Sequence, residues 1–127
     1  MQFQSYKVNS KHRVGKPTNN ASIWTVSEWV EIQIFGEAAR NAWRSNGKDL
    51  LWSVHANTTG ILKIGLDPSN DLYIAKFRCD NNQEWHGYPV HPRNDDIPPE
   101  AVLEEWRRAK IIDNADKRRI QTGKFRK

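Results

Sequence analysis

The sequence has very little cysteine, because Cys79 is the only one among 127 residues. An intramolecular disulfide is therefore excluded, and so is any metal site that needs two cysteine ligands. No stretch approaches the roughly 18 consecutive apolar residues of a membrane-spanning helix. The segment from Met1 to Val14 is polar and lacks the apolar core of a signal peptide. We therefore expect a cytoplasmic protein in a reducing compartment, with no membrane partner.

Established catalytic motifs are also missing. The sequence contains no P-loop, no G-x-G-x-x-G fingerprint, no G-x-S-x-G elbow and no H-E-x-x-H motif. A chain of 127 residues corresponds to one domain, which is too short for a Rossmann dehydrogenase, a kinase or a barrel enzyme. His86 and His91 lie near Asp95 and Asp96, but the spacing matches no recognised metal-ligand pattern. We expect neither a metal site nor a bound cofactor.

The net charge of +5 is distributed unevenly along the chain. Residues 1–16 carry four basic and no acidic side chains, and residues 107–127 carry nine basic and two acidic ones. Residues 17–106 carry seven basic and thirteen acidic side chains, so an acidic body lies between two basic ends. Basic ends attract phosphate backbones through counterion release, without reading sequence. Nucleic acid is thus the favoured partner, with an acidic protein, or plain solvation of the ends, as alternatives.

Helical spacing of apolar residues predicts a first helix over 26–46. Thr25 and Glu28 fit a capping box at its start, and Trp29 fits the fourth helical position of a hydrophobic staple. Apolar residues also alternate in this stretch, so a strand over 29–35 followed by a short helix is the alternative.

From residue 49 the apolar period changes from helical to alternating. The apolar runs are separated by turn sequences rich in Asn, Asp, Gly and Pro. Such short, evenly spaced runs are typical of an antiparallel meander. We predict three to four strands, namely Leu50–His55, Ile61–Leu66, Leu72–Cys79 and Glu84–Val90.

Two short helices are predicted after a proline-rich loop over 91–99. The first spans Glu100–Ala109, with proline before its first turn, an acid early and arginines late, as the helix dipole favours. Asp113 is placed to cap a second helix that runs to about Thr122.

These elements predict the α+β fold class. A single domain over residues 22–122 would consist of an N-terminal helix, the meander and the two C-terminal helices. A polar basic arm over 1–21 would precede it, and a basic tail over 123–127 would follow it. Six tryptophans indicate an aromatic core, with Trp29 and Trp106 expected inside it.

The densest group of reactive side chains lies in Glu84–Arg93, where the fourth predicted strand becomes a loop. Polar groups that converge at such a point often form a site, and histidine transfers protons readily near neutral pH. A metal-independent ribonuclease needs a base for the 2′-hydroxyl, an acid for the leaving oxygen and a cation for the phosphate. A structural turn without function is the alternative. The candidate catalytic residues are His86, His91 and Arg93, with Tyr88 and His55 in reserve.

The basic C-terminal segment supplies the candidate nucleic-acid contacts, together with one aromatic ring expected to be exposed. Two short helices with a tight connection have the outline of a helix-turn-helix, but the second is short and its apolar face narrow. Phosphate contacts with RNA are therefore favoured over sequence-specific DNA binding, and a solvated helix face is the alternative. The residues are Trp85, Arg107, Arg108, Lys110, Lys117, Arg118, Arg119 and Lys124.

The size and charge are like those of many small bacterial toxins, antitoxins and phage proteins. We expect a small basic nucleic-acid-binding protein, with RNA favoured; if it is an enzyme, a metal-independent endoribonuclease of bacterial toxin type is expected. The alternative is a non-enzymatic interaction module, or regulator, of a bacterial or phage complex. A ribonuclease should place His86 near a second His, Lys or Tyr in an open basic cleft. An interaction module should show an exposed apolar patch or an unpaired edge strand.

Overall fold

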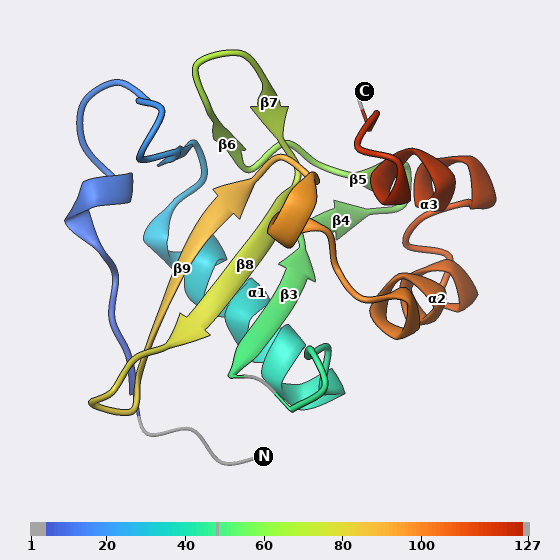
Figure 1. The fold of residues 1–127 in the computed structure, drawn as a ribbon, viewed down its shortest axis with the longest axis horizontal. Coiled ribbons are helices and arrows are strands. Elements are labelled where there is room, and N and C mark those ends of the chain that lie inside the picture. The colour runs from blue at the N-terminus through green and yellow to red at the C-terminus, as the bar shows by residue number, and fades with distance from the viewer. Residues whose placement is uncertain (1–4, 48, 126–127) are drawn as a thin grey trace.

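Two antiparallel strands form the centre of the protein, in a computed structural model that describes residues 5–47 and 49–125. Strands β8 (Ile74–Cys79) and β9 (Glu84–Val90) pair along the whole length of β8. Strand β3 (Leu50–Val54) lies antiparallel to β8, and β1 (Ser5–Tyr6) lies parallel to β9. The sheet order is β1-β9-β8-β3. Together with three α-helices, this sheet makes the described residues a mixed α+β domain (Figure 1).

The predicted meander order is wrong, because β3 pairs directly with β8. The predicted strand Ile61–Leu66 is instead divided between two small sheets. One is the hairpin of β4 (Ala56–Asn57) and β5 (Gly60–Ile61). The other has the order β2-β6-β7 and consists of β2 (Ile23–Trp24), β6 (Gly65–Leu66) and β7 (Asp71–Leu72).

Gly65 explains why the chain leaves the predicted path at β6. A Cβ atom at this position would lie 2.4 Å from Pro89 Cγ and 2.7 Å from the carbonyl oxygen of Ile23. The missing side chain therefore lets β6 pack against β2 and the end of β9 rather than against β3.

Helix α1 (Glu28–Asn41) covers one face of the sheet and follows the short strand β2, so it is not the first element of the fold. Its cap is Ser27, whose hydroxyl accepts a hydrogen bond from the backbone N–H of Val30; the predicted cap at Thr25 is wrong. It ends at Ala42, which adopts a left-handed conformation before the predicted stop. No helix within the described residues is long and apolar enough to span a membrane.

The buried face of α1 does not include Trp29. Ile34, Phe35 and Ala38 are buried, and the ring of Phe35 lies against the ring of Phe77 at a centroid distance of 5.3 Å. Trp29 is 76% exposed, so the prediction that it lies in the core is wrong.

The N-terminal segment, expected to form an arm, packs against α1 and β9. Tyr6 and Arg13 both donate hydrogen bonds to the carboxylate of Glu31, which is fully buried in α1. The Arg13 Nη2 atom lies 2.6 Å from the Glu31 Oε1 atom. Burial, together with the charge of Glu31, raises the pKa of Tyr6 far above its usual range. The short helix η1 (Ser10–His12) contacts β2, and its last residue, His12, stacks on Tyr88 of β9.

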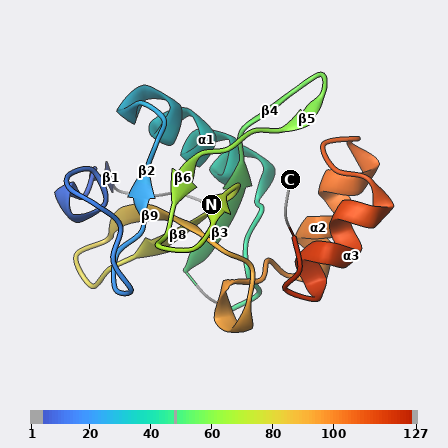
Figure 2. The same ribbon diagram turned by 90° about the horizontal axis from the view of Figure 1, so that it is seen from above.

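The two C-terminal helices form as predicted and pack beyond β3, away from β1 and η1 (Figure 2). Helix α2 (Glu100–Arg108) places Trp106 against Trp43, with the ring centroids 5.7 Å apart. Helix α3 (Asn114–Gln121) begins with a complete capping box formed by Asp113 and Asp116. A short helix, η2 (Asn94–Asp96), lies in the loop between β9 and α2.

Trp106 and Trp29 provide a matched test of this packing. Trp106 is fully buried, so Trp106→Ala should lower the free energy of unfolding by about 3–5 kcal/mol. Trp29→Ala should leave the melting temperature within a degree or two, because its ring is mostly exposed. Chemical denaturation followed by circular dichroism measures both, and equal losses for the two variants would contradict the assigned helix faces.

Candidate functional site

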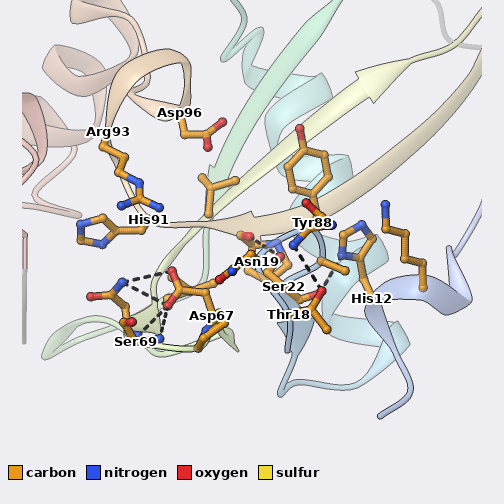
Figure 3. A pocket seen from close by; sticks show the side chains of 18 residues that line it. His12, Thr18, Asn19, Ser22, Asp67, Ser69, Tyr88, His91, Arg93 and Asp96 are labelled. Atoms are coloured by element: carbon orange, nitrogen blue, oxygen red, sulfur yellow. Dashed lines mark hydrogen bonds between the residues drawn. The ribbon is translucent and has the colours of Figure 1, made fainter. Parts of the chain in front are cut away.

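A cavity of about 570 Å³ opens beside the C-terminal half of β9. Its other walls are the segment over 18–22 and the β6–β7 turn over 67–70 (Figure 3). Three of the predicted catalytic residues, Tyr88, His91 and Arg93, line this cavity. The N-terminal segment adds Lys11 and His12, which the sequence did not single out.

His12 is the most constrained polar side chain of the pocket. It is only 8% exposed, and its Nδ1 atom lies 2.7 Å from the carbonyl oxygen of Ser22. Because a carbonyl only accepts, Nδ1 carries the proton of the neutral ring and Nε2 carries the lone pair. The imidazole stacks on Tyr88, with a centroid distance of 5.2 Å and an interplanar angle of 16°. This tautomer and fixed ring orientation are what a general base needs.

The pKa of His12 lies below its usual value. Burial is the main cause, and the nearby charge of Lys11 acts in the same direction. The hydrogen bond to the Ser22 carbonyl and the charge of Glu31 oppose the shift without cancelling it. His12 is therefore neutral at physiological pH, the form that accepts a proton.

The opposite wall of the pocket carries a fixed carboxylate, Asp67. Its Oδ1 atom accepts hydrogen bonds from the backbone N–H groups of Ser69, at 2.8 Å, and Asn70, at 2.6 Å. Burial disfavours its charge, but a hydrogen bond from the Asn70 side-chain amide, the two backbone hydrogen bonds and the charge of His91 together outweigh burial and lower the pKa of Asp67. Asp67 is therefore ionised beside His91.

Figure 3 shows His91 and Arg93 next to each other at one end of the pocket, and His12 and Tyr88 at the other. Arg93 and Lys11 are both exposed at the surface, so their charges can reach a ligand. Asp96, on the same rim, is paired with Lys76 at 3.0 Å. The pocket thus has two imidazoles, a phenol and two cations around one opening.

The structure does not place His86 and His55 in this pocket. His86 lies near the start of β9, where its Nε2 atom is 2.9 Å from the Asp80 Oδ2 atom and 3.5 Å from the Glu84 Oε1 atom. His55 is half-buried directly after β3.

The described basic residues near the C-terminus divide into half-buried and exposed groups. Two of the exposed ones are also paired, Arg108 with Glu104 at 3.5 Å and Arg119 with Asp116 at 3.3 Å. Arg107 and Lys117 form ion pairs with Glu104, at 2.8 Å and 3.0 Å, and these pairs lower the pKa of Glu104 well below its usual range. Trp85 is 3% exposed, so the prediction that its ring is available to stack on bases is wrong. The exposed cations are Arg108, Lys110, Arg118, Arg119 and Lys124.

Sequence reasoning missed His12 because no local pattern marks it. It stands in a polar stretch between Lys11 and Arg13, and the next residue, Arg13, pairs with the distant Glu31. The one signal in the sequence was Glu31, a single charged residue on an otherwise apolar helix face. Such a residue indicates that a basic side chain from another part of the chain must pair with it.

Comparisons of the chain with protein-family models, with curated proteins and with solved structures found no significant match. The geometry of the pocket and the charges around it are therefore what indicates the function of this protein.

The depressed pKa of His12 predicts how stability depends on pH. In the unfolded chain His12 has its usual pKa of about 6.5, so the unfolded state binds a proton there before the folded state does. The contribution of His12 to stability is therefore complete above about pH 6.5 and is lost as the pH falls below it. An NMR titration of the His12 ring should show a midpoint below about pH 6.5. Urea unfolding should give a smaller free energy of unfolding at pH 5.5 than at pH 7.5. A His12 midpoint at or above 6.5 would contradict the assigned burial.

Proposed function

We propose that this protein binds RNA and cleaves it at the His12–His91 pocket without a metal ion. The observation that supports the proposal is the neutral imidazole of His12, held by the Ser22 carbonyl and stacked on Tyr88, in the pocket that His91 and Arg93 also line. Acid–base cleavage of RNA needs these groups and no cofactor.

The proposed reaction is an intramolecular transesterification. His12 Nε2 takes the proton of a 2′-hydroxyl, and the resulting oxyanion attacks the adjacent phosphorus. The bond from phosphorus to the 5′-oxygen breaks, and protonated His91 donates a proton to that leaving oxygen. A 2′,3′-cyclic phosphate and a 5′-hydroxyl result. The support for His91 as the acid is its place in the pocket near Asp67, whose pKa the charge of His91 helps to lower.

The cations at the pocket rim fit the charge that develops in this step. Arg93 can neutralise the phosphate oxygens through its fork of N–H donors, and Lys11 lies beside the proposed base. The exposed cations of α2, α3 and the chain after α3 support binding of the RNA backbone on another part of the surface. A reducing cytoplasm is the compartment we propose, since the only cysteine is unpaired.

Replacement of either imidazole tests the reaction. His12→Ala and His91→Ala should each reduce single-turnover cleavage of RNA about 10²–10⁴-fold, the usual contribution of a general acid or base. RNA affinity should change little, and activity should persist in EDTA. The assay uses a labelled single-stranded RNA, with protein in excess over substrate.

His55→Ala is the matched control, because His55 lies outside the pocket. This variant should cleave RNA at the same rate as the parent protein. A parent protein that cuts no RNA in this assay would overturn the enzymatic proposal. If His12→Ala cleaves RNA as fast as the parent, the pocket is not the site of the reaction.

The exposed cations predict the salt dependence of RNA binding. Replacement of Arg118, Arg119 and Lys124 by Ala should weaken binding and reduce the slope of log K against log salt by about 2–3 units, through three lost phosphate contacts. Replacement of Arg107 should change the slope less, since it is half-buried and donates two hydrogen bonds to Glu104, whereas Arg119 is exposed and has a single 3.3 Å contact with Asp116. Fluorescence anisotropy over a salt series measures both, and an unchanged slope for the triple variant would exclude this surface.

One observation favours the alternative of a protein interaction module. Trp29 and Ile32 are exposed on the outer face of α1, at 76% and 44%, and lie one helical turn apart. If the parent protein neither binds nor cuts RNA in the two assays above, the interaction module becomes the favoured function, with this apolar face of α1 as its binding surface.

A further inference from the structure

We propose that the hairpin between β8 and β9 binds a divalent transition-metal ion, best fitted by Zn²⁺, through Asp80, Glu84 and His86. The pocket reaction does not use these residues, and the inference is independent of RNA cleavage. His86 was the first residue that the sequence singled out, and its surroundings fit metal coordination better than proton transfer to a substrate.

The three donor atoms already have the spacing of a metal site. The His86 Nε2 atom is 2.9 Å from the Asp80 Oδ2 atom and 3.5 Å from the Glu84 Oε1 atom. All three donor atoms lie within 4.8 Å of one another. Zinc bonds to nitrogen and oxygen of about 2.0–2.2 Å place tetrahedral ligands roughly 3.3–3.5 Å apart. The side chains therefore need only small movements to hold an ion.

The hairpin fixes one of the carboxylates before any ion binds. The Asp80 Oδ1 atom accepts hydrogen bonds from the backbone N–H groups of Asn82, at 2.8 Å, and Glu84, at 3.0 Å. The backbone N–H of Asp80 also donates to the carbonyl of Glu84 at 3.0 Å, and Gln83 completes the turn with a positive φ of 63°. Oδ2 is thereby directed toward His86, as a preorganised ligand requires.

The imidazole of His86 is oriented through its Nε2 atom by the carboxylates of Asp80 and Glu84. Its Nδ1 atom is buried and has no hydrogen-bond partner among the described residues. The neighbour across the strands is Arg78, which is exposed and forms no ion pair with a described residue. Two carboxylates thus face one imidazole, and an added dication would balance their charge.

The mixture of ligand atoms selects the kind of ion. Mg²⁺ and Ca²⁺ prefer sites made only of oxygen ligands, whereas imidazole with carboxylate suits Zn²⁺ and its neighbours in the series. Three protein ligands at a partly exposed turn leave a fourth position for water.

The test is a calorimetric titration of the full chain with ZnCl₂ in a non-chelating buffer at pH 7.5. The parent should bind one equivalent, and His86→Ala should lower the affinity at least about tenfold. Asp80→Asn is the sharper variant, because its amide oxygen can still accept the turn hydrogen bonds while the ligand charge is lost. It should fold like the parent and lose zinc affinity as well. His55→Ala is the matched control and should bind like the parent.

Thermal unfolding gives an independent readout, since an ion that binds only the folded state raises the melting temperature. Zinc should raise the melting temperature of the parent and of His55→Ala, and should leave the melting temperature of Asp80→Asn unchanged. No stoichiometric binding by the parent, or binding that both Asp80→Asn and His86→Ala retain, would overturn the site. Zinc binding lost in His12→Ala instead would assign the ion to the pocket. None of these outcomes depends on RNA cleavage.

Discussion

The buried carboxylate of Glu31 is the interaction on which the rest of the arrangement depends. It lies in the first turn of α1 and is fully shielded from water, so its charge must be compensated inside the protein. Arg13 and Tyr6 provide that compensation from a segment that precedes the helix by many residues. A buried ion pair adds little compared with an apolar pair, but the loss of one partner costs about 3–5 kcal/mol. The pair therefore specifies where the N-terminal segment lies more than it adds stability.

The position of that segment in turn completes the pocket. Arg13 directly follows His12, so the ion pair with Glu31 sets the path of η1 along β9. The Ser22 hydroxyl donates to the carbonyl of Pro89 at 2.6 Å, while the Ser22 carbonyl accepts from His12. On β9, Gly87 leaves room for this layer, because a Cβ there would lie 2.3 Å from the Phe77 ring and 2.7 Å from the Tyr6 hydroxyl. The contacts that pack the N-terminal segment against α1 and β9 are thus the same contacts that form the proposed site.

Elements specified by local interactions could be predicted from the sequence. Strand β9 has the predicted bounds, and α3 has the predicted Asp113 cap, because alternation and capping involve neighbouring residues only. The start of α1 was misplaced because Thr25 and Ser27 both resemble caps. With Ser27 as the cap, Trp29 is the second helical residue and not the fourth, so it does not occupy the staple position that was expected to bury it. The pairing of β3 with β8 depends on contacts between distant parts of the chain, which periodicity does not reveal.

The candidate site was predictable only on its β9 side. Tyr88, His91 and Arg93 belong to one continuous strand and loop, and the pattern there indicated a site. His86 shares that strand, but it lies nearer the turn, where its imidazole pairs with Asp80 and does not line the pocket. The second imidazole of the pocket comes from a segment whose location depends on a buried charge pair, and no motif encodes such a pair.

The central claim is that the Glu31 pair places His12 on Tyr88, and a nuclear Overhauser measurement tests it most directly. Cross-peaks between the ring protons of His12 and Tyr88 should be present in the parent, since their centroids are 5.2 Å apart. In Arg13→Ala the cross-peaks should be lost, while the contacts between Phe35 and Phe77 persist. Absence of the His12–Tyr88 cross-peaks in the parent, or their persistence in Arg13→Ala, would contradict the account.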